Sequence, residues 1–169
     1  DKGTVWAPNI PGWDNYPLYT VLSEKVKELP LVIENDRACY IMGETWKGAA
    51  AGCTDAIYLA VGTGIGAGIL SGGQLLRGAN DIAGAIGWMH AGQTYPKPKR
   101  PCGHFEYYSS GEGIAELTRS ILLTRKDYTG PLSTLPLTAI TAHAVFDAYK
   151  QQDKIAQEVF RQCVALWGT

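Results

Sequence analysis

Closely paired cysteines are missing from this sequence. Its four cysteines, Cys39, Cys53, Cys102 and Cys163, are scattered over 169 residues with no Cys-x-x-Cys pair. Small domains held together by disulfides carry many closely spaced cysteines, so the pattern excludes a disulfide scaffold. It favours a reducing compartment, and we expect the protein to be cytoplasmic.

A long uninterrupted apolar stretch is also missing. The longest mainly apolar run, residues 56–70, is interrupted by small and polar residues: Gly62, Thr63, Gly64, Gly66 and Gly68. A membrane-spanning helix needs about 20 consecutive apolar residues, so we expect no membrane association. The first residues do not follow the order of a signal peptide. They include no methionine, and we expect the chain to be a piece of a longer protein.

Charge of either sign is scarce. Charged residues make up 18% of the chain, against about a quarter in an average domain. The formal net charge is −1, and the only basic cluster, residues 97–100, is short and interrupted by a proline. We interpret this cluster as a solvated loop. The sequence therefore has no electrostatic footprint for nucleic acid, and we expect no nucleic-acid partner for this segment.

Apolar residues and glycines are abundant, at 46% of the chain and 20 residues respectively. The chain can bury a core as one domain or as parts of two. Apolar spacing predicts a helix over residues 17–29, which Pro30 ends, and then a short strand over residues 31–33. Asn35 or Asp36 can cap the next helix, whose apolar spacing continues to Ala49.

The middle of the chain predicts antiparallel strands. Residues 56–61 and 67–70 read as strands joined by a glycine-rich turn, with a second turn at residues 71–73. Because the alternating glycines lead into a strand and not into a helix, the Rossmann motif is excluded. Further helices are predicted to begin near Ser109 or Ser110, at Thr141 and at Asp153. The chain is therefore of mixed α/β class.

Two clusters of residues could carry chemistry. Backbone N–H groups of the glycine-rich turn can cradle phosphate oxygens, and Thr63 adds a hydroxyl donor. A purely structural hairpin is the alternative. Asp36 could act as a general base on a substrate hydroxyl, and Asn35 could hydrogen-bond sugar hydroxyls. The alternative for this pair is a helix cap, and the two roles can coexist.

Several motifs occur in a fixed order: PNIPGW (8–13), IENDRA (33–38), LAVGTGIGAGILSGGQLLRGAN (59–80), AGAIGWM (83–89) and FEYYSSGEGIAE (105–116). Together they resemble the ROK family of sugar kinases and sugar-responsive repressors. The resemblance implies part of an actin-like, ribonuclease-H-like ATPase fold with sugar bound between two lobes. Residues 1–36 would be the end of the N-terminal lobe with a sugar-pocket segment, and residues 37–169 an incomplete C-terminal lobe.

The resemblance also implies roles for individual residues. Asp36 would be the catalytic base and Asn35 a sugar ligand, and Glu106 would hold sugar hydroxyls. The phosphate-binding loop would be formed by four residues: Gly62, Thr63, Gly64 and Gly66. Asn9 and Gly12 would line the sugar pocket from the other side. ATP with Mg²⁺, a small-molecule sugar and a homodimer are the implied cofactor and partners.

The sequence departs from the family pattern in the segment after the hairpin. Ala85 and Trp88 stand where the family usually has a sugar-binding Glu and a His that serves zinc. Trp88 could pack apolar surface together with Phe105, or it could stack on a sugar face. The zinc knuckle is degenerate and leaves three weak candidate ligands: His90, Cys102 and His104. Structural zinc sites use four ligands, so we do not expect zinc.

Two family elements are not found in the sequence. These are an N-terminal Asp-Gly-Gly phosphate loop and a C-terminal glycine-rich nucleotide contact, so the chain resembles the middle of the family fold. The resulting prediction is an ATP-dependent kinase that phosphorylates a hexose or an N-acetylhexosamine. One alternative is a non-catalytic sugar-sensing domain of an ROK-type transcriptional repressor. The other is a folded remnant kept as an interaction domain.

Overall fold

The computed structural model describes residues 3–5, 7, 10–90, 98 and 101–168. The chain divides into two compact units, residues 1–36 and residues 37–169. The assignment of these units to the lobes of a larger protein remains a prediction. Among the described residues, no helix has both the length and the apolar character needed to cross a membrane.

The described residues of the first unit form the helix α1 (Leu18–Lys25) and an isolated antiparallel bridge between Val5 and Tyr16. The helix ends earlier than its apolar spacing predicts, because Val26 leaves helical geometry at φ −115° and ψ 43°. None of the described side chains of this unit is buried. Its local order comes from contacts such as the stacked rings of Trp13 and Tyr16, whose centroids are 4.8 Å apart.

The strand predicted over residues 31–33 is wrong. These residues have no regular secondary structure, although the helix predicted after them is present as α2 (Asp36–Lys47). A strand exists only when its backbone pairs with a neighbour. No described strand pairs with this apolar segment, so β-propensity alone does not make it a strand.

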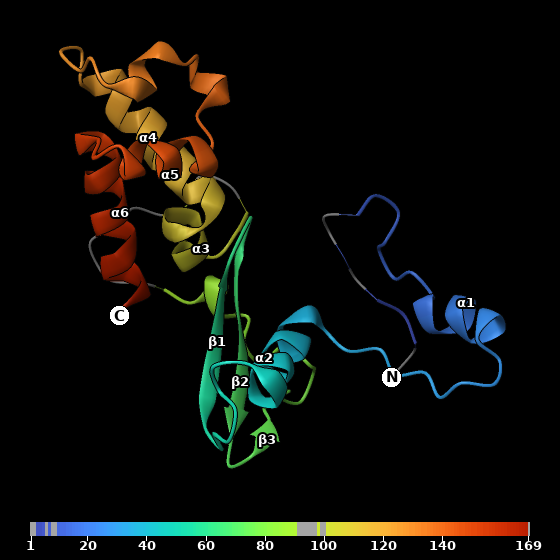
Figure 1. Ribbon diagram of the computed structural model, residues 1–169. Helices are drawn as coiled ribbons and strands as arrows, with labels where there is room; N and C mark the ends of the chain where they lie inside the picture. Colours follow the sequence, from blue (N-terminus) through green and yellow to red (C-terminus); the bar gives the residue numbers. More distant parts are fainter. Residues whose placement is uncertain (1–2, 6, 8–9, 91–97, 99–100, 169) are drawn as a thin grey trace. The chain divides into compact units, whose positions relative to one another are not determined.

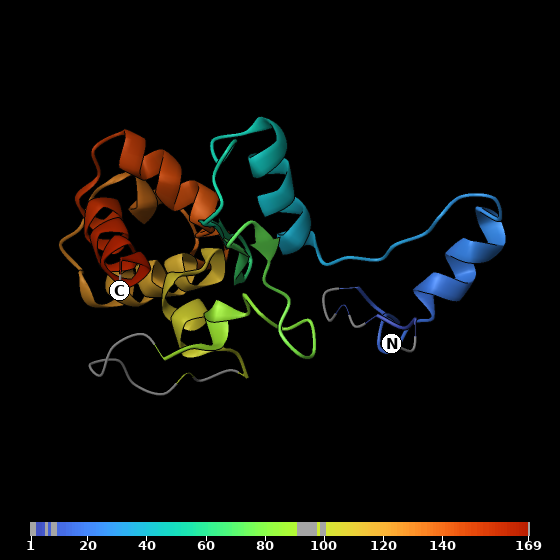
Figure 2. The same ribbon diagram turned by 90° about the horizontal axis from the view of Figure 1, so that it is seen from below.

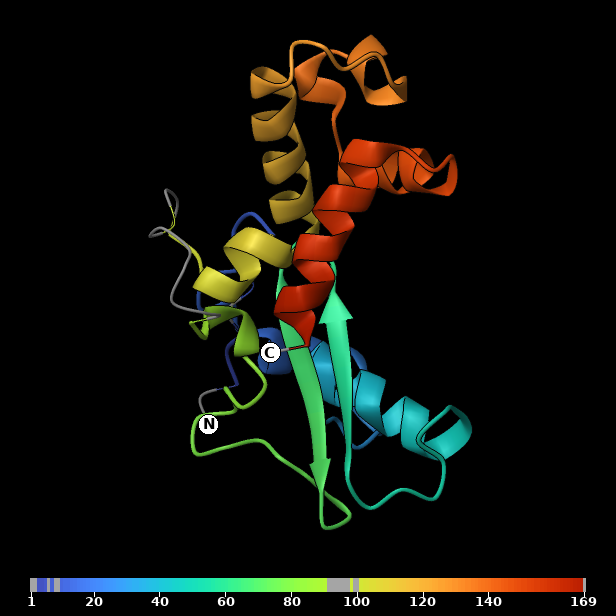
Figure 3. The same cartoon turned by 90° about the vertical axis from the view of Figure 1, so that its left-hand side faces the viewer.

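The second unit begins with α2 and a three-stranded antiparallel sheet in the order β1 (Ala56–Val61), β2 (Ile65–Ser71), β3 (Gln74–Leu75). Val61 pairs with Ile65, which leaves a tight connection of residues 62–64, called here the glycine turn. The predicted hairpin is confirmed, although β2 begins earlier than predicted. Figures 1 and 3 show that the glycine turn lies at the end of the hairpin that faces the helices of this unit.

Helix α2 covers one face of the hairpin because β2 carries glycines where the helix approaches. A Cβ built at Gly68 would clash with the carbonyl oxygen of Arg37 and lie 2.9 Å from the side chain of Ile41. The rings of Tyr40 and Tyr58 contact each other across the same interface, with centroids 5.2 Å apart. The Gly66 and Gly68 positions therefore allow helix–strand contact that any larger residue would prevent.

After the sheet come η1 (Ile86–Trp88) and α3 (His104–Ser109), then α4 (Gly111–Thr124), and the short helices η2 (Pro131–Thr134) and η3 (Leu137–Ala139). Helices α5 (Ala142–Lys150) and α6 (Lys154–Trp167) complete the unit. Figure 2 shows α4, α5 and α6 packed side by side. Their contact surface is the main core, in which Val145 and Val159 are completely buried.

The helix starts predicted near Ser109 or Ser110, at Thr141 and at Asp153 are confirmed, the first with Ser110 as its cap. Each of these side chains accepts a hydrogen bond from the backbone N–H three residues later, at 2.9–3.2 Å. Such a cap satisfies one of the N–H groups that a helix leaves unpaired at its first turn. A second core cluster of Ile65, Phe105 and Leu166 joins the sheet to the helices. These contacts fix the glycine turn against α3 and α4.

Candidate functional site: a glycine turn beside an open cavity

Glu106 lies at the glycine turn. Its Oε2 atom accepts a hydrogen bond of 3.0 Å from the backbone N–H of Ile65, the residue that follows the turn. A Cβ built at Gly64 would lie 2.5 Å from the same oxygen. Only glycine therefore allows the carboxylate this close to the turn. The structure thus brings a candidate sugar ligand and a candidate phosphate-binding loop together within one unit.

The glycine turn also contacts the first residue of α4. The backbone N–H of Gly111 donates a hydrogen bond of 2.8 Å to the carbonyl oxygen of Gly62, and a Cβ built at Gly111 would lie 2.8 Å from that oxygen. The amino-terminal end of a helix carries a partial positive charge from its unpaired N–H groups. The glycine turn consequently lies at the positive end of the α4 dipole.

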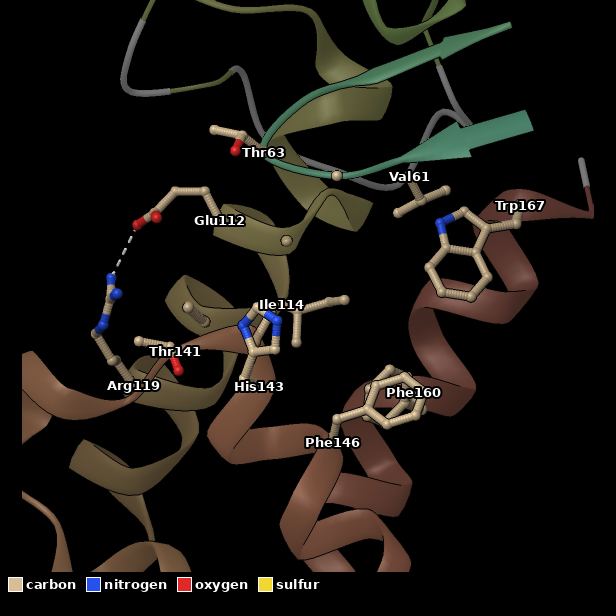
Figure 4. Close-up of a pocket in the computed structure, with 14 residues that line it drawn as sticks. Val61, Thr63, Glu112, Ile114, Arg119, Thr141, His143, Phe146, Phe160 and Trp167 are labelled. Atoms are coloured by element: carbon tan, nitrogen blue, oxygen red, sulfur yellow. Dashed lines mark hydrogen bonds and ion pairs between the residues drawn. The ribbon is translucent and has the colours of Figure 1, made fainter. Parts of the chain in front are cut away.

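A cavity of about 610 Å³ opens beside the glycine turn. Its lining comes from the end of β1, the turn, and helices α4, α5 and α6 (Figure 4). The lining residues include Val61, Gly62, Thr63, Glu112, Ile114, Arg119, Thr141, His143, Phe146, Phe160 and Trp167. Small-molecule sites commonly have volumes of about 300–1,000 Å³ and apolar walls with a few polar groups, so this cavity has the size and character of a ligand site.

One side of the cavity is aromatic and apolar. Figure 4 shows Phe146, Phe160 and Trp167 on this side, across from the charged residues. The rings of Phe146 and Phe160 meet edge to face, with centroids 4.9 Å apart and planes at 83°. The indole Nε1–H of Trp167 donates to the carbonyl oxygen of Ser109 at 3.0 Å, which holds that ring in place. Such a wall suits a flat, weakly polar ring system.

The opposite side of the cavity is charged. Arg119 Nη1 lies 3.2 Å from Glu112 Oε1 and 3.3 Å from Glu116 Oε2. Its Nη2–H donates to the carbonyl oxygen of Ile140 at 3.1 Å. Within the described chain, the Nε atom of Arg119 is buried and has no hydrogen-bond partner. The guanidinium is therefore anchored at one end and directed at carboxylates at the other.

Gly66, the remaining predicted phosphate-loop residue, lies outside the glycine turn. It is buried inside β2 opposite Ala60, and a Cβ built there would lie 2.5 Å from Cδ of Arg37. The structure gives this glycine a packing function at the contact with α2. Its role in phosphate binding stays a prediction.

The predicted base and its neighbours belong to the first unit. Asp36 is exposed at the first position of α2, and Asn35 immediately precedes that helix. The backbone N–H of Asn35 donates to Oε1 of Glu34 at 3.2 Å. Gly12 lies in an exposed turn with φ +83°, a conformation that favours glycine. Asn9 lies outside the described residues, and the roles of all these residues stay predictions.

The three weak zinc candidates do not form a ligand set. Among the residues that the structure describes, no group of three or more His, Cys, Asp or Glu side chains could hold a metal ion. The rings of His90 and His104 stack face to face, with centroids 4.1 Å apart and planes at 19°. Ring nitrogens bind metals in the ring plane, so two stacked rings do not direct their lone pairs at one ion.

The two alternatives for Trp88 can now be compared. Trp88 ends the short helix η1 and is 64% exposed, so its predicted packing against apolar surface is wrong. Phe105 is buried in the second core cluster, as predicted. Stacking of Trp88 on a sugar face stays open. Ala85 precedes η1 and has no polar side-chain atoms with which to replace a sugar-binding glutamate.

Comparison with known proteins identifies the family. The sequence model of the ROK family matches residues 1–169, and the chain belongs to this family. It is 34% identical over 165 residues to a glucokinase from Halalkalibacterium halodurans, which covers 94% of this chain and 48% of the relative. It is 33% identical over 126 residues to a xylose repressor from Caldicellulosiruptor bescii, which covers 72% of this chain and 31% of the relative.

Solved structures agree with this assignment. A ROK family glucokinase from Streptomyces griseus, in complex with glucose and AMPPNP, superposes with a TM-score of 0.79 at 29% identity. The match covers 96% of this chain and 54% of that one. The chain accordingly has part of the actin-like ATPase fold. It spans about half the length of the curated relatives that it matches.

Proposed function

We propose that the protein to which this chain belongs is an ATP-dependent sugar kinase acting on a hexose or an N-acetylhexosamine. The observation that carries the proposal is the Glu106 carboxylate held at the glycine turn, with the hydrogen bond to Ile65 at 3.0 Å. A group that can accept from sugar hydroxyls is thereby adjacent to a loop that can bind phosphate. Similarity to glucokinases, β-glucoside kinases and N-acetylglucosamine kinases supports the same reaction class.

The proposed reaction transfers the γ-phosphoryl group of ATP to a sugar hydroxyl. Asp36 accepts the hydroxyl proton while the hydroxyl oxygen forms a bond to the γ-phosphorus. The bond between that phosphorus and the β–γ bridging oxygen breaks, and ADP leaves with the bond electrons. Asn35 and Glu106 orient the sugar. Catalysis of this kind depends on positioning and on stabilising charge more than on covalent chemistry.

The cavity is the proposed site of the nucleotide. Its apolar wall suits the base, and the hydroxyl of Thr63 and the positive end of the α4 dipole suit the phosphates. Mg²⁺ is proposed to arrive with the phosphates, since it keeps several waters and needs only one or two protein carboxylates. It would neutralise charge on the transferring group.

The test is phosphate transfer by the full-length protein to a panel of hexoses and N-acetylhexosamines, with Asp36→Asn as the control. Transfer to one sugar that is lost in the variant would establish the function and name the substrate. A folded protein that binds ATP and transfers phosphate to none of the sugars would overturn it.

A sugar sensor is the second candidate. It is favoured by Ala85, which supplies no sugar ligand, and by similarity to a xylose repressor. A sensor would be stabilised by its sugar without transferring phosphate, and the full-length protein would bind operator DNA. Stabilisation by sugar together with turnover would decide for the kinase.

We further propose a cytoplasmic homodimer. None of the four cysteines forms a disulfide, and Cys39 and Cys53 are exposed, which suits a reducing compartment. The dimer rests on the family resemblance alone. Light scattering of the full-length protein at micromolar concentration tests it, and a mass of one chain would contradict it.

A further inference from the structure

Two glutamates of α4 share one arginine but differ in what else they contact. Glu112 and Glu116 both pair with Nη1 of Arg119, at 3.2 and 3.3 Å. Only Glu112 lines the cavity, where Figure 4 shows it beside Thr63. The chain therefore contains one carboxylate directed at a ligand site and a matched carboxylate that is not.

Arg119 fixes the position of the Glu112 carboxylate. The guanidinium is held at its other end by the carbonyl oxygen of Ile140, a completely buried residue. This anchored group engages Oε1 of Glu112. Within the described part of the chain, Oε2 of Glu112 makes no hydrogen bond and is available to accept one. A carboxylate held in one orientation can select for ligand groups that donate hydrogen bonds.

The location of Glu112 limits which part of a nucleotide it can contact. It directly follows Gly111, which is hydrogen-bonded to the glycine turn. A carboxylate repels phosphate oxygens, so its contact must be a hydrogen-bond donor close to the phosphates. The ribose is attached to the phosphates and carries two hydroxyl donors. The base lies farther from the phosphates and suits the aromatic wall.

We infer that Glu112 accepts a hydrogen bond from the ribose hydroxyls of the nucleotide and makes the cavity selective for ribonucleotides. The inference deepens the proposed function and rests on it for the identity of the cavity's ligand. Arg119 acts as the positioning residue. Loss of a hydrogen bond to a charged group inside a site weakens binding by roughly tenfold or more.

The experiment measures the Kd of the full-length protein for ATP and for 2′,3′-dideoxy-ATP by calorimetry, in wild type, Glu112→Ala and Glu116→Ala. We expect wild type and Glu116→Ala to bind ATP about tenfold more tightly than the dideoxy nucleotide. Glu112→Ala should bind ATP about tenfold more weakly and the dideoxy nucleotide unchanged, so its preference disappears.

Three outcomes would overturn the inference. The first is equal affinity of wild type for both nucleotides, including no binding of either. The second is an equal loss of affinity for both nucleotides in Glu112→Ala. The third is loss of the preference for ATP in Glu116→Ala. Phosphate transfer to sugar is measured on the same samples. Transfer without a ribose preference would refute the inference alone. A ribose preference without transfer would refute the proposed kinase and leave the inference standing.

Discussion

The two units of the chain differ in what holds them together. Residues 37–169 contain two hydrophobic clusters with many completely buried side chains, including Ile140 and Cys163. Among the described residues of 1–36, those of α1 included, no side chain is buried. The second unit supplies the cavity, the glycine turn and Glu106. The first supplies Asn35 and the proposed base Asp36, and Asp36 is the first residue of α2, which packs against the hairpin of the second unit.

The largest expected effect of this difference is on the rate of backbone amide hydrogen exchange with solvent. In the 169-residue chain, amides of α6 should exchange at least roughly a thousandfold more slowly than amides of α1, since buried elements exchange only by large-scale unfolding. Hydrogen exchange followed by mass spectrometry or NMR checks this. Comparable protection in the two helices would show that the first unit has a stabilising core of its own.

A large effect is also expected from one core substitution. Ile155 on α6 is 2% exposed, and Ile155→Ala should lower the free energy of unfolding by about 2–5 kcal/mol through lost burial and a residual cavity. The matched control is Leu29→Ala in the first unit, where the side chain is 69% exposed and the expected change is below about 0.5 kcal/mol. Urea unfolding measures both. Equal effects would contradict the comparison.

Within the second unit, one tyrosine links a loop to α6. The hydroxyl of Tyr128 donates to Oδ2 of Asp153 at 2.7 Å and accepts from the backbone N–H of Leu132 at 3.2 Å. Tyr128→Phe leaves both partners without this contact and should cost about 1–2 kcal/mol. Urea unfolding at pH 7 measures it, and an unchanged midpoint would show that water replaces the hydroxyl.

The same tyrosine predicts a loss of stability in alkali. Burial, and then the hydrogen bond to Asp153, raise the pKa of Tyr128 to about 12. Because the pKa in the folded state lies above the unfolded value near 10, the stabilisation is present below pH 10 and disappears as the pH rises towards 12. Thermal unfolding from pH 8 to 11.5 should therefore show a steeper decline for wild type than for Tyr128→Phe. Parallel declines would exclude this tyrosine as the cause.

The smallest effect is expected at the exposed end of the hairpin. Hydrogen bonds from the backbone N–H of Gly72 and from the hydroxyls of Thr54 and Ser71 lower the pKa of Asp55. The stabilisation is present above the unfolded pKa near 3.9 and is lost as the pH falls through the lower folded value. Asp55→Asn should slightly lower the melting temperature at pH 7, and the difference from wild type should shrink in acid. A difference that persists below pH 2 would contradict this explanation.

Local features of the sequence predicted much of the fold. Side chains of Ser110, Thr141 and Asp153 cap the helices that follow them, because a cap depends on residues a few positions apart. The hairpin of β1 and β2 followed from apolar runs and glycines. The helix predicted to begin near Ser109 or Ser110 is α4, and α3, which directly precedes it, was not predicted. Residues 31–33 failed as a strand because strand formation depends on a partner that local sequence does not reveal.

The candidate site was only partly predictable. The motifs identified the glycine turn and Glu106, and the structure joins them through the Ile65 hydrogen bond. The cavity was missed because its walls come from β1, α4, α5 and α6, which are far apart in the sequence. One signal was available. Glu112, Glu116 and Arg119 are spaced to share one face of a helix, and such a charged group directly after the Ser110 cap could have drawn attention to this surface.

The central proposal is that Asp36 provides the base and that the cavity of the second unit binds the nucleotide. The most direct measurement compares ATP affinity and sugar phosphorylation in the full-length protein before and after Asp36→Asn. We predict that transfer falls roughly 10²- to 10⁴-fold, as for loss of a general base, while the Kd for ATP stays within about twofold. Transfer within tenfold of wild type, or a parallel loss of ATP binding, would contradict the account.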